Sequence, residues 1–256
     1  MKKRIICGLL FAIMITAVPV HAKAGTPAWA KKGKVAHACG GIKNYKYVNS
    51  EPSLKNAIKK GSRAIEIDFA WTSDRKLVCA HKSSDFKKGR PSLKTWQTKL
   101  LRGRYKTMTS RTALTLMAKS GRYLIVDTQE SNAVAVYKEI KRQLTKMGRR
   151  SYMKKVVPQI YSKAQYKQFR AVYKFPAGIF ALYKVKPWMS EQLIDIARFC
   201  QSRRLAVALH KNLLTTGRKA ILKKYAVPVA VDSVNTKKEF KKLRRQGVIV
   251  FTDFLI

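Results

Sequence analysis

The chain has 256 residues, of which 46% are hydrophobic, so it can bury a substantial core and is not intrinsically disordered. Its 55 Lys and Arg residues far outnumber its 13 Asp and Glu residues, and the formal net charge is +42. A charge of this size excludes an acidic, self-solvating protein and predicts attraction to polyanions.

Residues 1–24 have the pattern of a secretory signal peptide. Basic residues from Lys2 to Arg4 precede an apolar run from Ile5 to Val20, and Ala22-Lys23-Ala24 supplies an A-x-A cleavage pattern. Cys7 stands at the start of the apolar run rather than after it, which argues against a lipoprotein. A retained N-terminal anchor is the alternative, although the run is short for a membrane-spanning helix. We therefore predict a bacterial protein that is exported after cleavage near Ala24.

Export narrows the choice of partners. Removing residues 1–24 takes away four basic residues and no acidic residue, which lowers the charge from +42 to +38. An exported protein meets little nucleic acid, so no nucleic-acid partner is expected. Anionic membrane surfaces and phosphate-rich wall polymers are the expected polyanions, and adaptation to an acidic habitat is an alternative cause of the charge. The sequence leaves the oligomeric state open.

The elements after a polar lead-in (25–33) alternate between apolar extended runs and helical segments. The expected strands are 35–38, 64–70, 123–127, 156–161, 178–183, 205–209, 227–231 and 248–251. The expected helices between them are 53–60, 110–119, 131–147, 163–169, 191–200, 216–223 and 236–246. A further extended run at 77–81 returns beside the second strand, and 82–107 is expected to be a long loop.

Eight apolar strands separated by helices predict parallel β-α units and an α/β fold, a TIM (β/α)8 barrel. The alternative is an open doubly wound sheet, but the chain lacks the Gly-rich phosphate loop of such folds. Only 252–256 follow the last strand, so no final helix is expected, and the lead-in or a partner chain would cover that gap. We expect one domain over 25–256.

The second strand carries an unusual feature. Ile65, Ile67 and Phe69 alternate with Glu66 and Asp68, so an apparently buried strand points two carboxylates to the same side. Two ionised carboxylates about 5 Å apart repel by about 3 kcal/mol at an effective dielectric of ~20. A bound cation, a shared proton or an internal ion-pair network with Lys and Arg would each offset this repulsion.

Polar side chains also stand at the ends of the other expected strands, where TIM barrels carry their active sites. They are His37, Glu66, Asp68, His81, Asp127, Gln159, Lys211 and Asn235. The exported chain has only three histidines, so the presence of two among these strand ends is informative. The third, His210, is expected to be structural.

Three cysteines remain after export: Cys39, Cys79 and Cys200. An odd count allows at most one disulfide. Cys39 and Cys79 each lie two residues from a histidine of the expected site, so they are the candidate pair, and free buried thiols are the alternative.

The ordered set of motifs resembles the glycerophosphodiester phosphodiesterase family, within the phospholipase C-like phosphodiesterases. The motifs are His37-Ala38-Cys39-Gly40-Gly41, Asn49-Ser50, Glu66-Ile67-Asp68, Trp71-Thr72-Ser73-Asp74, His81, Asp127, Ser233-Val234-Asn235 and Thr252-Asp253-Phe254-Leu255. The first of these motifs resembles that of a bacterial branch of the family. The match runs in family order from near the mature N-terminus to the end of the chain.

The resemblance implies a TIM barrel in which Glu66, Asp68 and Asp127 hold one divalent cation. All-oxygen ligation suits Ca²⁺ or Mg²⁺ and disfavours zinc. His37 and His81 would be the catalytic acid–base pair. In the family's mechanism, one histidine deprotonates a substrate hydroxyl next to the phosphodiester, and the other protonates the leaving alcohol; the sequence does not say which does which. Gln159, Lys211, Asn235 and Trp188 are the expected substrate-binding residues.

Two departures from the family pattern leave the substrate open. Many relatives have Arg after the first histidine and Lys two residues after the third-strand acid, and this chain has Ala38 and Gln129 there. The expected function is an exported metal-dependent phosphodiesterase acting on glycerophosphodiesters, either deacylated phospholipids or glycerol-phosphate wall polymers. The alternatives are a phospholipase C- or D-like enzyme acting on intact lipids, and a catalytically silent barrel that binds polyanions at the cell surface. Trp71, Trp96, Tyr183 and Trp188 are expected either to line a cleft or to pack in the core.

Overall fold

The computed structural model describes residues 26–183 and 190–256, so the predicted signal peptide and Trp188 lie outside the described residues. Eight parallel strands form a closed barrel, because the first strand pairs with both the second and the last. These strands are β1 (Lys34–Ala36), β2 (Ala64–Trp71), β7 (Tyr123–Asp127), β8 (Val156–Ile160), β9 (Gly178–Ala181), β10 (Leu205–His210), β11 (Val229–Asp232) and β12 (Ile249–Thr252). The predicted TIM barrel is confirmed.

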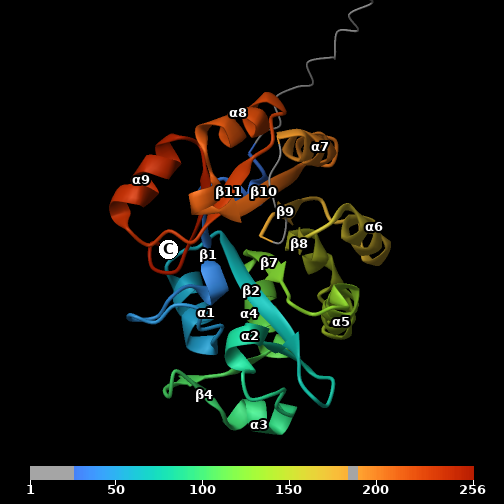
Figure 1. Ribbon diagram of the computed structural model, residues 1–256. Coiled ribbons are helices and arrows are strands. Elements are labelled where there is room, and N and C mark those ends of the chain that lie inside the picture. Colours follow the sequence, from blue (N-terminus) through green and yellow to red (C-terminus); the bar gives the residue numbers. More distant parts are fainter. Residues whose placement is uncertain (1–25, 184–189) are drawn as a thin grey trace, which may run out of the picture.

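Helices connect successive strands and surround the barrel (Figure 1). They are α1 (Glu51–Lys59), α4 (Ser110–Ser120), α5 (Ala133–Lys146), α6 (Lys163–Val172), α7 (Ser190–Gln201), α8 (Thr216–Lys224) and α9 (Lys237–Arg245). The side-chain oxygens of Ser50, Thr109 and Ser162 cap α1, α4 and α6. Helical periodicity and caps explain why these helices agree with their predicted positions within a few residues.

Two apolar layers hold the barrel together. The outward-facing residues of the strands, such as Ile65, Ile67 and Phe69, pack against the helices. A second cluster contains inward-facing residues such as Ala64 and Ile125, together with fully buried Trp29 from the short 3-10 helix η1 (Ala28–Ala30). The lead-in therefore seals the barrel interior rather than the side of the barrel after the last strand.

The C-terminal residues pack beside the first strand turn. Ile256 packs against the outer apolar cluster, and a Cβ at Gly40 would lie 2.6 Å from its Cδ1 atom. Phe254 approaches Gly41 in the same way. These contacts explain why glycines follow the first strand, and they place the chain end between α9 and α1, where no further helix stands (Figure 1).

The prediction of a long loop over 82–107 is wrong in detail. It contains α2 (Lys82–Asp85), α3 (Leu93–Thr98) and a hairpin of β4 (Leu100–Leu101) and β5 (Tyr105–Lys106). β3 (Leu77–Cys79) pairs antiparallel with the end of β2, and β6 (Met108–Thr109) pairs with β3. We call 77–109, from β3 to β6, the insertion; most residues of a small apolar cluster around fully buried Trp96 come from it. Its elements are too short to show a hydrophobic period.

The described cysteines and helices settle two further points. Cys39, Cys79 and Cys200 are all buried free thiols, so the disulfide considered for Cys39 and Cys79 is not formed. Within 26–183 and 190–256, no helix has the length and apolar character needed to cross a bilayer.

Candidate active site

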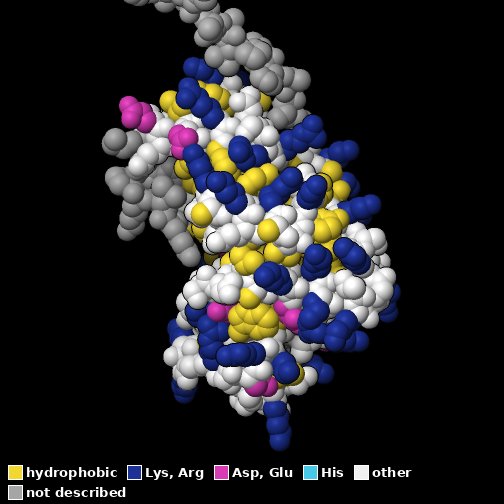
Figure 2. Space-filling view, turned by 90° about the vertical axis from the view of Figure 1, so that its right-hand side faces the viewer, with side chains coloured by type: hydrophobic (Ala, Val, Ile, Leu, Met, Phe, Trp, Pro, Cys, Tyr) yellow, Lys and Arg dark blue, Asp and Glu magenta, His cyan; other side chains and the backbone are white. Residues whose placement is uncertain are grey.

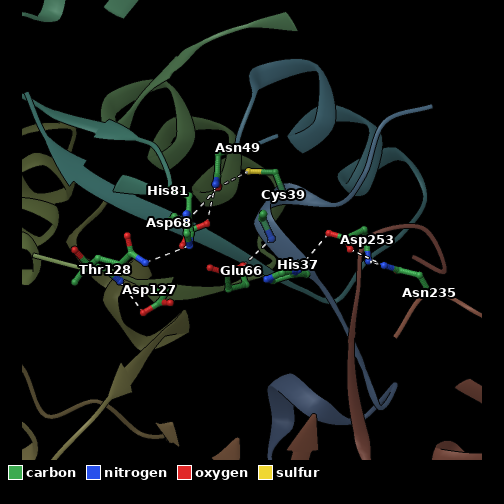
Figure 3. Close-up of polar contacts among 12 residues, drawn as sticks. His37, Cys39, Asn49, Glu66, Asp68, His81, Asp127, Thr128, Asn235 and Asp253 are labelled. Carbon is green, nitrogen blue, oxygen red and sulfur yellow. Dashed lines mark hydrogen bonds and ion pairs between the residues drawn. The ribbon is translucent and has the colours of Figure 1, made fainter. Parts of the chain in front are cut away.

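The three predicted metal ligands meet at the carboxyl ends of neighbouring strands. Alternation along β2 turns Glu66 and Asp68 into the barrel, and the parallel register places Asp127 of β7 beside Asp68. One oxygen from each carboxylate lies within 4.8 Å of the others. Figure 3 shows the three side chains converging, with His37 and His81 beside them. The sequence prediction that these residues come together is therefore correct.

One oxygen of each carboxylate is fixed by a protein donor. The donors are the Ala38 N–H to Glu66 Oε2 (2.6 Å), the Asn49 amide to Asp68 Oδ2 (2.7 Å), and the Thr128 N–H (2.7 Å) and Tyr161 hydroxyl (2.6 Å) to Asp127 Oδ1. These hydrogen bonds hold the three carboxylates in the arrangement in which one oxygen of each lies within 4.8 Å of the others. This arrangement orients three acceptors toward one point, as a metal site requires.

The donor to Glu66 depends on an unusual turn after β1. Ala38, Cys39 and Gly40 all have positive φ (46°, 69° and 79°), within and just after the 3-10 turn η2 (His37–Cys39). Non-glycine residues in this conformation cost on the order of 1 kcal/mol or more each. The Asn49 N–H donates to the Ala38 carbonyl (3.2 Å) and helps to hold the turn. The strained backbone thus aims an N–H at the carboxylate.

The charges of the cluster favour a cation. Burial, followed by the neighbouring charges of Asp68 and Asp127, raises the pKa of Glu66 well above its usual range. Burial and then Asp68 raise the pKa of Asp127 to about 6. Oxygen ligands about 2.4 Å from a Ca²⁺ ion can lie at most about 4.8 Å apart. The all-carboxylate donor set and its spacing therefore fit a hard divalent cation.

His37 is held by a carboxylate from the last strand. Its Nδ1 lies 3.2 Å from Asp253 Oδ1, and its Nε2 lies 4.0 Å from Glu66 Oε2. The Asn235 amide donates to Asp253 Oδ2 (2.7 Å) and Asn235 Oδ1 accepts from the Asp253 N–H (2.9 Å). Burial opposes a charge on His37, but the hydrogen bond and charge of Asp253 outweigh it and raise the pKa of the imidazole.

His81 belongs to the insertion and has neutral partners. Its Nδ1 lies 3.1 Å from the Ser84 hydroxyl, and its Nε2 lies 3.3 Å from the Gln129 amide nitrogen. Gln129 Oε1 accepts from the Ser83 N–H (2.9 Å), which turns the Gln129 NH₂ toward the imidazole. An NH₂ group can only donate, so His81 Nε2 accepts and the proton of the neutral ring is on Nδ1. This arrangement keeps a lone pair on Nε2.

A pocket of about 180 Å³ joins these groups. It is lined by His37, Tyr47, Glu66, Asp68, His81, Asp127, Gln129, Gln159, Tyr161, Tyr183, Asp232 and Phe251. The Tyr47 ring stands between the histidines, with ring centroids 4.5 Å from His37 and 5.8 Å from His81. The two histidines and the three carboxylates therefore share one cavity.

The predicted substrate-binding residues divide into three groups. Gln159 lines the pocket and is only 5% exposed. Asn235 is engaged with Asp253, and Lys211 forms an ion pair with Glu239 (2.9 Å), so neither faces the pocket as predicted. Trp188 is not described. Among the residues expected to line a cleft or pack in the core, Tyr183 lines the pocket, whereas Trp71 and Trp96 pack in apolar clusters.

Sequence reasoning gave no role to Tyr47, Tyr161 or Asp232, and it quoted Asp253 without giving it a role. Asp232 is the last residue of β11, and Asp253 directly follows β12. The strand-end argument used for Asp127 could therefore have found both. Tyr47 follows the first strand turn with φ of 56°, and no pattern announces it. His210, expected to be structural, is exposed at the end of β10.

Comparison with known proteins shows which solved structures this fold resembles. No protein-family profile and no curated protein match the sequence. Among solved structures, a phosphodiesterase from Oleispira antarctica in complex with the product sn-glycerol-3-phosphate has 16% identity and a TM-score of 0.66, covering 86% of this chain and 92% of that chain. A glycerophosphodiester phosphodiesterase from Parabacteroides distasonis has 17% identity and a TM-score of 0.66, with the same coverage.

A third similar structure is the glycerophosphodiester phosphodiesterase from Thermotoga maritima, with 13% identity and a TM-score of 0.61, covering 86% of this chain and 93% of that chain. The similarity thus extends over nearly the whole barrel of three proteins that share few residues with this chain. The resemblance inferred from short motifs is therefore confirmed at the level of the fold: this chain has the barrel fold of the glycerophosphodiester phosphodiesterases.

Proposed function

We propose that this chain is an exported phosphodiesterase that hydrolyses glycerophosphodiesters with the help of one divalent cation. The observation that carries the proposal is the shared pocket in which three converging carboxylates adjoin two histidines. The similar structures named as glycerophosphodiester phosphodiesterases support it, and the product bound to the Oleispira protein indicates the chemical class of the substrate.

Glu66, Asp68 and Asp127 would hold the cation, which supplies neutralisation of charge on the phosphoryl oxygens. Calcium fits an all-oxygen set of this span, and magnesium is the alternative. The remaining steps use this chain's own side chains. Hydrogen bonds from the protein keep the three carboxylates in place.

The partners of the two histidines support one assignment of their roles. His81 Nε2 is the acceptor nitrogen of the ring, so we assign His81 as the base: a glycerol hydroxyl next to the phosphodiester takes the place of the Gln129 NH₂ at Nε2 and gives up its proton there. His37 is favoured in its cationic form by Asp253, so it acts as the acid. As the hydroxyl oxygen bonds to phosphorus, the bond from phosphorus to the leaving alcohol breaks, and that alcohol takes the proton from His37.

The product of this step is a cyclic phosphate, and a second step opens it. His37, now neutral, removes a proton from water as the water oxygen bonds to phosphorus. The bond from phosphorus to the glycerol hydroxyl oxygen breaks, and that oxygen takes the proton from His81. Both histidines then return to their starting states, so the sequence of steps balances.

The direct test measures hydrolysis of glycerophosphocholine, glycerophosphoethanolamine and poly(glycerol phosphate), with and without a chelator. Wild-type protein with added Ca²⁺ is expected to cleave at least one of them, and chelation or Glu66→Ala is expected to abolish cleavage. The matched control is Glu139→Ala, which removes an acid that pairs with Arg142 on α5. Turnover that persists in both the chelated and the Glu66→Ala samples contradicts the metal-assisted mechanism. Intact lipid vesicles in the same panel separate a phospholipase activity from the proposed one.

A catalytically silent, polyanion-binding barrel is the second candidate, because no Lys or Arg of the described residues lines the pocket. The outer surface, in contrast to the pocket, is rich in Lys and Arg. Figure 2 shows these side chains spread over the viewed face with few acidic ones. α9 alone carries six basic residues and one acidic residue. Binding to poly(glycerol phosphate) or anionic vesicles that falls steeply with salt, without turnover of any diester, favours this candidate.

Export is part of the proposal because residues 1–24 have the composition of a signal peptide. Expression of the full chain in a bacterial host, followed by fractionation and N-terminal sequencing, tests it. A protein that starts near Gly25 in the extracytoplasmic fraction is the expected result, and an uncleaved cytoplasmic protein is the contrary one.

A further inference from the structure

Asp232 is the carboxylate in the pocket that the proposed mechanism does not use. It ends β11, and its neighbour on the same strand, Ala230, belongs to the inward-facing apolar cluster. Strand alternation therefore turns Asp232 inward as well, and Asp232 lines the pocket. Within the described chain, Asp232 forms no ion pair, and its Oδ1 is buried without a hydrogen-bond partner.

An unpaired, buried carboxylate oxygen costs stability unless something compensates it. The surroundings of Asp232 offer only weak compensation. The charges of His37 and His210 lower its pKa, but burial outweighs them and keeps the pKa raised. An arrangement that is unfavourable in the empty pocket is explained if a ligand supplies the missing partner.

A second unpartnered group lies in the same cavity. Gln159 is 95% buried, lines the pocket from β8, and its Oε1 has no partner among the described residues. Asp232 comes from β11, on the far side of the barrel from β2 and β7, where the metal ligands stand, whereas Gln159 comes from β8, which pairs with β7. The pocket thus has one wall with the metal ligands and Gln159, and a second wall, at β11, where Asp232 has an unused acceptor.

The balance of charge decides what this second wall binds. Glu66, Asp68, Asp127 and Asp232 all line the pocket, and no described Lys or Arg does. A divalent cation offsets two negative charges, and a phosphodiester adds one, so negative charge remains beside Asp232. A hydroxyl group would satisfy the oxygen but leave that charge, whereas an ammonium group satisfies both.

The aromatic side chains around Asp232 suit the same ligand. Tyr47, Tyr183 and Phe251 line the pocket with it, and the faces of such rings attract cations. The register of β11 and β12 puts Asp232 beside Phe251, and the Phe251 ring lies 6.4 Å (centroid to centroid) from the ring of His37, the proposed acid for the leaving alcohol. In the proposed mechanism the leaving alcohol therefore lies on the side of the pocket that carries Asp232.

We propose that Asp232 forms a subsite for a primary ammonium group on the leaving alcohol, so that this chain prefers aminoalcohol phosphodiesters. This inference rests on the proposed function for the position of the phosphate and of the leaving group. It makes Asp232 a specificity-determining residue, and it makes glycerophosphoethanolamine the preferred diester over glycerophosphoglycerol.

Calorimetry of Ca²⁺-loaded protein tests the subsite with three diesters: glycerophosphoethanolamine, glycerophosphocholine and glycerophosphoglycerol. A His81→Ala background keeps the diesters intact. We expect the ethanolamine diester to bind about tenfold or more tightly than the glycerol diester, as a charge-assisted hydrogen bond provides. The choline diester keeps the positive charge but has no N–H donor, and it is expected to bind more weakly than the ethanolamine diester.

Asp232→Asn is expected to reduce the ethanolamine preference to about twofold or less. It should also leave the melting temperature unchanged or raised, because it removes an unpaired buried charge. The matched control is Asp195→Asn. Asp195 is an exposed residue of α7 that forms an ion pair with Lys163 of α6, and its substitution should keep the preference. An unchanged preference in Asp232→Asn, or equal affinity of wild-type protein for the ethanolamine diester and either other diester, overturns the subsite.

Turnover measured on the same diesters separates this proposal from the proposed function. Hydrolysis without an ethanolamine preference overturns the subsite and supports the phosphodiesterase. An ethanolamine preference in binding, with no hydrolysis by wild-type protein, supports the subsite and contradicts the phosphodiesterase. Neither binding nor hydrolysis of any diester overturns both.

Discussion

The two histidines of the site are held by regions of very different construction. His37 follows a barrel strand, and Asp253, a buried carboxylate from the last strand, fixes its Nδ1. His81 lies just after the short antiparallel strand β3, and hydroxyl and amide groups of short segments fix its ring. The barrel region therefore supplies charge and rigidity, whereas the insertion supplies a neutral hydrogen-bond frame.

This difference separates two tasks that identical side chains must perform. A carboxylate partner stabilises the imidazolium and makes His37 a ready proton donor. The Gln129 amide donates to Nε2 of His81, which makes that nitrogen the acceptor of the ring. In the proposed mechanism, one fold would thus obtain an acid and a base from two histidines through their different partners.

The largest expected effect is the loss of either histidine. His37→Ala and His81→Ala should each lower kcat by about 10²–10⁴ on a natural diester, because each removes one proton transfer. A diester with a nitrophenol leaving group needs no acid, so the loss in His37→Ala should shrink to about tenfold while the loss in His81→Ala persists. Steady-state rates on the two substrates measure this, and the reverse pattern exchanges the two roles.

The carboxylates of the barrel region give the next effect, through pH. Without metal, Asp127 has a pKa of about 6 in the folded protein and about 4 when unfolded. The folded state therefore holds more protons between pH 4 and 6, so the free energy of unfolding falls as pH rises through that window. Above pH 6 the Asp127 carboxylate is ionised and available to a cation, and below pH 6 protons compete with the cation.

Added Ca²⁺ should accordingly raise the melting temperature by about 5–10 °C at pH 7, at a concentration about 100 times Kd. At pH 5 the rise should be much smaller, and the apparent affinity should fall about tenfold per pH unit for each proton displaced. Thermal melts across pH 5–7 measure this. Asp127→Asn serves as the comparison, since it removes a titrating group; a Ca²⁺ effect that ignores pH contradicts this account.

The contrast between the two regions also explains what the sequence could reveal. The carboxylate cluster was predictable because strand alternation and parallel β-α order place Glu66, Asp68 and Asp127 at one edge. Asp253 was not assigned to His37, because 216 residues separate them and only barrel closure joins the first and last strands. The strained turn at Ala38 and Cys39 was likewise hidden, since neither residue favours positive φ by itself.

The insertion was hidden for a different reason. Its strands have two or three residues and its helices four to six, which is too short for a hydrophobic period to emerge. Gln129 was noted only as a missing lysine, and its actual contacts depend on Ser83, 46 residues earlier. At the position where a lysine was expected, Gln129 is instead a hydrogen-bond partner of His81.

Asp253→Asn removes the negative charge beside His37 Nδ1, on the barrel side of the site, and leaves the proposed reacting groups in place. Asp253 is a positioning residue, and its loss removes the charge that favours the His37 imidazolium. We expect kcat to fall about 10–100-fold, and the high-pH limb of the kcat profile to move to lower pH, because the acid form of His37 is lost sooner. A pH profile measures this; a fall in kcat with no movement of that limb indicates a merely structural role.

Gln129→Ala gives the smallest expected effect, because it removes only a neutral hydrogen bond to His81. Such a bond contributes about 1 kcal/mol, so kcat should fall about three- to tenfold with KM nearly unchanged. Gln129→Glu is the informative companion, since a carboxylate at this position would favour the His81 imidazolium and move the low-pH limb of the profile to higher pH. If Gln129→Glu leaves that limb in place, Gln129 does not set the protonation of His81, and the barrel and insertion regions differ in construction without differing in chemical role.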